Sequence, residues 1–177
     1  LDSKLIEEGA STNSLMAGVQ LLPGESAEHY EKELRLLLDE VQGGSPMAAL
    51  LTRELYDSIV WARRHSLDKA AIILDEMADV ISGGIFGSNH ILAALQALII
   101  DPANEEASDL IDTRLSQMSA TMEGVRAMAI HRSIKKLEIL DNLISQQLNT
   151  ARHLQKSIEA LELKPRLLKR LDLQIES

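Results

Sequence analysis

The last third of the chain carries the clearest pattern of apolar positions. Between residues 137 and 161, mostly apolar side chains recur at alternating spacings of three and four residues. This heptad spacing puts one stripe on a single helix face and predicts that a second helix, from the same chain or another, covers it. We call this stripe the seam, and its members are Leu137, Leu140, Ile144, Gln147, Ala151, Leu154, Ile158 and Leu161.

The length of the predicted seam helix bears on its partner. A helix over residues 125–163 would be roughly 60 Å long at 1.5 Å per residue. Because this exceeds the width of a compact domain of the remaining residues, we expect part of it to project or to pair with another chain. Gln147 is polar at a core heptad position, where such a residue costs stability but can fix register and partner number. The sequence therefore favours a homo-oligomer or an obligate complex through the seam, with a monomeric bundle that covers the seam itself as the alternative.

Turn and capping signals divide the rest of the chain into further helices. Pro or Gly near residues 23, 43 and 83 interrupts the chain, and Ser or Asn follows as a helix cap. We expect helices over residues 27–41, 46–81 (continuous or restarting at Ser66), 89–100 and 105–163, with a bend near Gly124 and a stop at Pro165. The expected segments are an N-terminal arm (1–22), a helical body (23–123), and a long C-terminal helix with a basic tail (124–177).

The composition agrees with an all-α fold. Hydrophobic residues make up 45% of the chain, but only one Trp, two Tyr and one Phe are aromatic. The core must therefore consist of Leu, Ile, Ala, Val and Met, mostly good helix formers. We predict an all-α helical bundle with a long, coiled-coil-like C-terminal helix. The absence of cysteine excludes disulfides, thiolate metal sites and a cysteine nucleophile, and fits a cytoplasmic protein. No apolar run reaches membrane-spanning length, so we expect no membrane association.

Charge is unevenly distributed along the chain. The formal net charge is −9, with 21 acidic and 9 basic residues before position 131 and 6 acidic and 9 basic residues after position 130. An acidic body repels the phosphate backbone, so nucleic acid is disfavoured as a general partner. The basic C-terminal end can contact nucleic acid or, more simply, an acidic protein surface.

Two stretches resemble a family of short bacterial proteins of unknown function. That family has an Asn-Ala-x-x-x-Gly motif, a Leu-Pro-Gly-Glu turn, a glutamate-rich helix and a Leu-Trp-x-x-Arg-Arg helix end. Here the corresponding segments are residues 13–18, 22–25, 28–38 and 60–64, and residues 137–155 are similar to the family's C-terminal helix. The family usually has Lys-His before its glycine, where this chain has Met16 and Ala17. The resemblance implies no known activity.

Two pairs of carboxylates are the closest approach to a catalytic motif. Glu54 with Asp57, and Glu76 with Asp79, each lie on one helix face. If two such helices packed antiparallel, the four carboxylates could hold Mg²⁺ against nucleotide phosphates. Residues 76–80 resemble part of the motif of the MazG-like all-α nucleotide pyrophosphohydrolases. With a quarter of the residues charged, however, such pairs on solvated faces are common.

Arginines suggest a third type of site. Arg63 and Arg64, near Trp61, can form an anion patch with a stacking ring. The simpler account packs Trp61 in the core and leaves the arginines at a solvated edge or paired with acids. None of the five histidines has the spacing of a zinc or di-iron site.

Three functional hypotheses follow from the sequence. The first is a non-enzymatic interaction or assembly protein, bacterial or carried by a mobile element, that acts through helix-mediated protein contacts and uses no cofactor. The second is a Mg²⁺-dependent nucleotide pyrophosphohydrolase. The third is an accessory protein that associates with nucleic acid.

Overall fold

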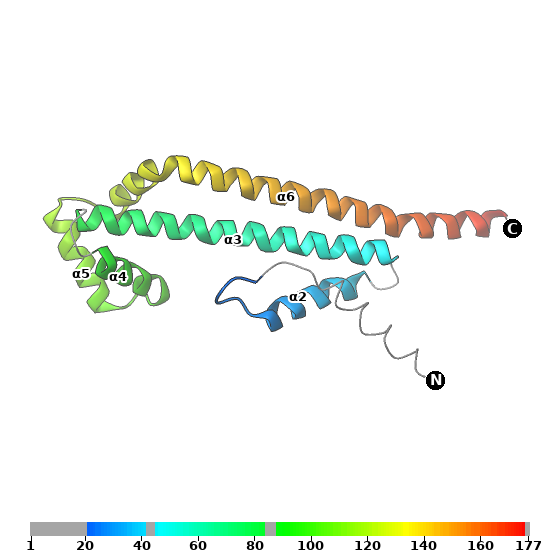
Figure 1. The fold of residues 1–177 in the computed structure, drawn as a ribbon, viewed down its shortest axis with the longest axis horizontal. Coiled ribbons are helices and arrows are strands. Elements are labelled where there is room, and N and C mark those ends of the chain that lie inside the picture. Colours follow the sequence, from blue (N-terminus) through cyan, green and yellow to red (C-terminus); the bar gives the residue numbers. More distant parts are fainter. Residues whose placement is uncertain (1–20, 42–44, 84–87, 176–177) are drawn as a thin grey trace, which may run out of the picture. The chain divides into compact units, whose positions relative to one another are not determined.

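The computed structural model describes residues 21–41, 45–83 and 88–175, with side chains up to residue 161. Across these residues it has five helices and no strand, so the predicted all-α bundle with a long C-terminal helix is confirmed (Figure 1). The expected N-terminal arm, apart from its last two residues, and the Gly43-Gly44 helix stop lie outside the described residues. The helices are α2 (Ala27–Glu40), α3 (Pro46–Ser82), α4 (Ser88–Ile100), α5 (Glu105–Gln117) and α6 (Met122–Ile175).

The chain divides into two compact units, and α3 and α6 contribute to both. Unit 1 contains residues 1–61 and 147–177, and unit 2 contains residues 62–146. None of the described helices is long and apolar enough to cross a membrane.

The turn before α2 explains the Leu-Pro-Gly-Glu motif. The Glu25 N–H donates to the Leu22 carbonyl at 3.1 Å, and Gly24 has a φ of +91°. This is a type II turn, in which Pro presets the first central position and Gly supplies the positive φ of the second. The Glu25 carboxylate also accepts from the Leu22 N–H at 2.9 Å. Ser26 then caps α2 as predicted, because its hydroxyl accepts from the His29 N–H.

One predicted helix is in fact two. Instead of a single helix from residue 105 with a bend near Gly124, α5 ends at Gln117 and α6 begins at Met122. Ser119 has a φ of +50°, and the Ala120 N–H donates to the Leu115 carbonyl at 3.0 Å, as in a Schellman stop. The Thr121 hydroxyl then accepts from the Gly124 N–H and caps α6. The stop was missed because Ser, not Gly, adopts the left-handed conformation.

Three other helix boundaries were only partly predicted. α3 runs unbroken through Ser66. The pair Asp101-Pro102 in the sequence predicts a cap and a first helical residue, but the N-cap of α5 is Asn104, whose side chain accepts from the Ala107 N–H at 3.0 Å. The Asp101 carboxylate accepts from the Ala103 N–H within the preceding turn. α6 continues past Pro165 to Ile175, although a proline removes one backbone hydrogen bond from a helix.

Unit 2 holds a core to which α3, α4, α5 and α6 all contribute. Its most deeply buried members are Ala78 of α3, Ile111 of α5, and Val125 and Ala129 of α6, each at most 1% exposed. The other buried members are Met77, Val80, Ile81, Ile91, Ala94, Leu95, Ala107 and Leu115. The low aromatic content is therefore compensated by branched aliphatic side chains packed around small residues.

In unit 2, α3 and α6 lie side by side and antiparallel (Figure 1). The Lys69 Nζ lies 2.6 Å from an Asp141 carboxylate oxygen, and further along α3 Glu76 lies 3.6 Å from Lys136. The most buried positions on these two helix segments include the small residues Ala78, Ala129 and Ser133. Small side chains at the contact let helix axes approach closely, since interaxial distance depends on the side chains between them.

Unit 1 joins α2, the first part of α3 and the later part of α6. Here too the buried positions carry small side chains, including Ala48, Thr52 and Ser58 on α3 and Ala151 on α6. The Thr52 and Ser58 hydroxyls donate to backbone carbonyls of their own helix, so burying these groups leaves no unpaired polar atom there.

We predict that α3 does not tolerate a larger side chain at its small buried positions. Ala78→Leu should lower the free energy of unfolding by about 1–3 kcal/mol, because overpacking forces side chains off their rotamers or the helices apart. Ala70→Leu, at an exposed position on the same helix, should change it by less than about 0.5 kcal/mol. Urea unfolding of both variants measures the difference, and equal effects would contradict the close packing.

Candidate interaction surfaces

The seam residues are covered by another helix of the same chain. Every one of its eight residues is buried or half-buried, with Leu137, Ala151 and Ile158 the most deeply buried. In unit 2 the partner helix is the second part of α3, and in unit 1 it is the first part of α3 (Figure 1). The contact that the heptad pattern requires is thus made within one chain. Association of two chains through the seam stays a prediction, and it would require this packing to open.

The four candidate metal ligands are not brought together. Glu54, Asp57, Glu76 and Asp79 all lie on α3, whereas the metal hypothesis requires two antiparallel helices. Residues 22 positions apart on one helix cannot share an ion. Asp57 accepts a hydrogen bond from Tyr30, and Glu76 pairs with Lys136. Among the described residues, no group of three or more His, Cys, Asp or Glu side chains is placed to hold a metal ion.

Asp57 instead belongs to a reciprocal pair of tyrosine contacts in unit 1. The Tyr30 hydroxyl on α2 donates to the Asp57 carboxylate at 2.5 Å, and the Tyr56 hydroxyl on α3 donates to the Glu33 carboxylate of α2 at 2.7 Å. The two rings are 4.9 Å apart, tilted by 53°. Aromatic pairs prefer such tilted or edge-on geometry. α2 has no fully buried residue, and these two hydrogen bonds and the ring contact join it to α3 within unit 1.

The environment of Tyr30 changes its acidity. Partial burial of the ring, together with the hydrogen bond to the Asp57 carboxylate and its negative charge, raises the pKa of the Tyr30 hydroxyl from 10.0 to about 12. The protonated phenol is therefore the form that the folded unit stabilises.

The two arginines do not form one surface. Arg64 is only 5% exposed, whereas Arg63 is exposed to solvent. Trp61, which the simpler account places in the core, is 38% exposed. An anion patch built from both guanidinium groups is therefore not present on the described surface.

Two groups of exposed apolar side chains that sequence reasoning missed lie in unit 2. On α6, outside the seam, four large apolar side chains are exposed, with Met128 and Ile139 on one side of the helix and Ile130 and Ile134 on another. At the end of α4, Ile99 and Ile100 are 63% and 85% exposed. Isoleucine and methionine at helical spacing predict buried core positions. Only the tertiary structure, which determines the face that each helix buries, shows that these residues are exposed.

No family model, curated protein or solved structure matches the chain. The resemblance of residues 13–18, 22–25 and 60–64 to a bacterial family therefore stays a prediction.

We predict that Tyr30 makes unit 1 sensitive to alkaline pH. Because the folded pKa is raised, its contribution to stability should be complete below pH 10 and lost as pH rises through about 12. Tyr30→Phe should cost about 1 kcal/mol below pH 10, since Asp57 loses a donor. The difference between wild type and variant should shrink between pH 10 and 12 in urea unfolding. A constant difference across this range would contradict the raised pKa.

Proposed function

We propose that the chain is a non-enzymatic helical assembly protein that binds a protein partner, or itself, through the outer faces of its helices. Bacterial or mobile-element origin, a cytoplasmic location and coiled-coil-like helix pairing belong to the same proposal. The observation that carries it is the exposed apolar side of α6 in unit 2.

The exposed apolar residues of α6 are not placed at random. Ile130 and Ile134 are one helical turn apart and so lie next to each other on the helix surface. They are 37% and 48% exposed, although isoleucine is a poorer helix former than the Lys, Glu or Ala typical of solvated faces. Neighbouring exposed apolar side chains mark interaction surfaces more often than isolated ones do. The seam supports the proposal indirectly. Because α3 of the same chain already covers the seam, a contact with another molecule has to use a different face of α6.

The pyrophosphohydrolase and nucleic-acid hypotheses have no comparable support. The former needs four converging carboxylates, and the described ones all lie on α3. The latter places Arg63 and Arg64 on one anion-binding surface, and Arg64 is buried.

We predict that Ile130→Asp with Ile134→Asp abolishes partner binding without unfolding the chain. Tagged wild type and variant would be expressed in the native cell, and the proteins recovered with each compared by quantitative mass spectrometry. Charges in an apolar contact should reduce recovery of the protein that contacts this face at least about tenfold. Helix content and melting temperature should stay unchanged, since both side chains are exposed.

Leu36→Asp is the matched control, because Leu36 is 59% exposed but lies on α2. It should recover the same proteins as the wild type. The proposal is wrong if neither another protein nor a second copy is recovered with the wild type, or if the double variant recovers everything that the wild type does.

A further inference from the structure

Unit 2 carries two exposed surfaces of opposite chemistry. The first, which we call the basic stripe, consists of Met128, Arg132, Lys135 and Ile139 of α6. These residues follow the spacing i, i+4, i+7, i+11 and so form one line along the helix. All four are exposed, with Ile139 at 62%. The alkyl stems of Arg and Lys extend the apolar surface between Met128 and Ile139.

The second surface, which we call the acidic face, consists of Ile99, Ile100, Glu105, Asp109 and Asp112. The two isoleucines end α4, and the three carboxylates follow the spacing i, i+4, i+7 on α5. All five residues are exposed. Residues 88–120 hold five acidic residues and one arginine, so this surface is strongly negative.

Most of the charges on these two surfaces have no counterion among the described side chains. Among the described residues, Arg132 and Lys135 form no ion pair, and neither do Glu105 and Asp109. Like charges three or four positions apart on a helix repel each other by a few tenths of a kcal/mol per pair. A surface of opposite charge would relieve both repulsions and cover the isoleucines.

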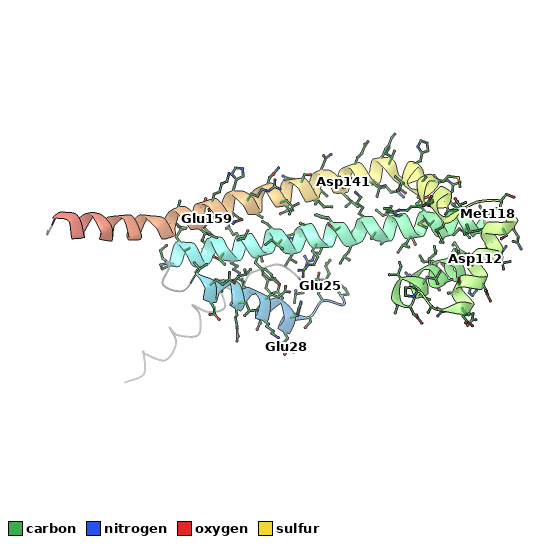
Figure 2. The ribbon with its side chains drawn as sticks, turned by 180° about the vertical axis from the view of Figure 1, so that it is seen from behind. Glu25, Glu28, Asp112, Met118, Asp141 and Glu159 are labelled. Atoms are coloured by element: carbon green, nitrogen blue, oxygen red, sulfur yellow. The ribbon has the colours of Figure 1, made fainter. Side chains whose placement is uncertain are left out.

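One molecule cannot join its own two surfaces. Within unit 2, α6 lies on one side of α3, and α4 and α5 lie on the other (Figures 1 and 2). Figure 2 labels Asp112 on α5, which lies across α3 from the main length of α6. The complementary surface must come from another molecule, and a second copy of this chain presents it.

We infer that the chain self-associates head to tail, with the basic stripe of one copy on the acidic face of the next. Such a heterologous contact leaves one stripe and one face unused at the two ends of a dimer, so it continues into an open chain or closes into a ring. This inference goes beyond the proposed function, because the basic stripe lies on a different side of α6 from Ile130 and Ile134.

The test uses charge reversal on the full chain, followed by sedimentation velocity at increasing protein concentration. Variant A carries Arg132→Glu and Lys135→Glu, and variant B carries Glu105→Lys and Asp109→Lys. Each variant alone opposes like charges, so its dissociation constant should rise at least about tenfold. In an equimolar mixture every A–B contact joins opposite charges, and assembly should return. The wild-type assembly should also weaken between 0.1 and 1 M salt.

The control carries Arg152→Glu and Lys156→Glu, which reverse two exposed charges on α6 outside the stripe. It should assemble like the wild type, and circular dichroism should show unchanged helicity in all variants. The inference is overturned if the wild type stays monomeric at every concentration, or if A and B assemble normally. Disruption of A alone, with no recovery on mixing, also overturns it and indicates an α6–α6 contact. A monomeric wild type does not decide the proposed function, which the Ile130 and Ile134 variants test against any protein.

Discussion

The close packing of α3 along α6 is the contact on which the rest of the structure depends. In each unit the most buried positions of these helices include Ala, Ser and Thr, and in unit 2 Lys69–Asp141 and Glu76–Lys136 set the antiparallel register. Small side chains allow the helices to approach closely. These positions do not tolerate larger residues, which would force the helices apart. In unit 2 the same α3 segment also contributes Met77 and Ile81 to the core shared with α4 and α5.

This packing decides which surfaces are left for other molecules. Because α3 occupies the seam, the residues with the strongest association pattern in the sequence are used to build the fold. The apolar side chains that stay exposed, such as Ile134 and Ile100, lie on faces that the bundle does not bury. Near Ile139 the exposed side chains of Arg132 and Lys135 are basic, and near Ile100 the exposed side chain of Glu105 is acidic, so apolar burial and charge complementarity can act together.

Local signals predicted most of the fold and little of the site. Heptad spacing located the seam, and Ser26 and Ser45 capped their helices as expected, because cap and period act over a few residues. The break before α6 was missed because Ser119 takes a conformation that sequence assigns to Gly. The sequence suggested Asp57 as a metal ligand, but in the folded chain its carboxylate accepts a hydrogen bond from the Tyr30 hydroxyl. Ile134 is exposed because α3 covers a different face of α6. The periodicity of a single helix does not show which of its faces is covered.

The most direct test asks whether α6 pairs with α3 of the same chain. The chain has no cysteine, so Lys69→Cys with Asp141→Cys introduces two unique thiols at positions whose native side chains touch. Losing this exposed ion pair should cost less than about 1 kcal/mol. A short bifunctional thiol cross-linker should give an intrachain-linked monomer, in a yield independent of protein concentration. A cross-linked dimer whose yield rises with concentration would show that the seam is closed between chains and would contradict the account.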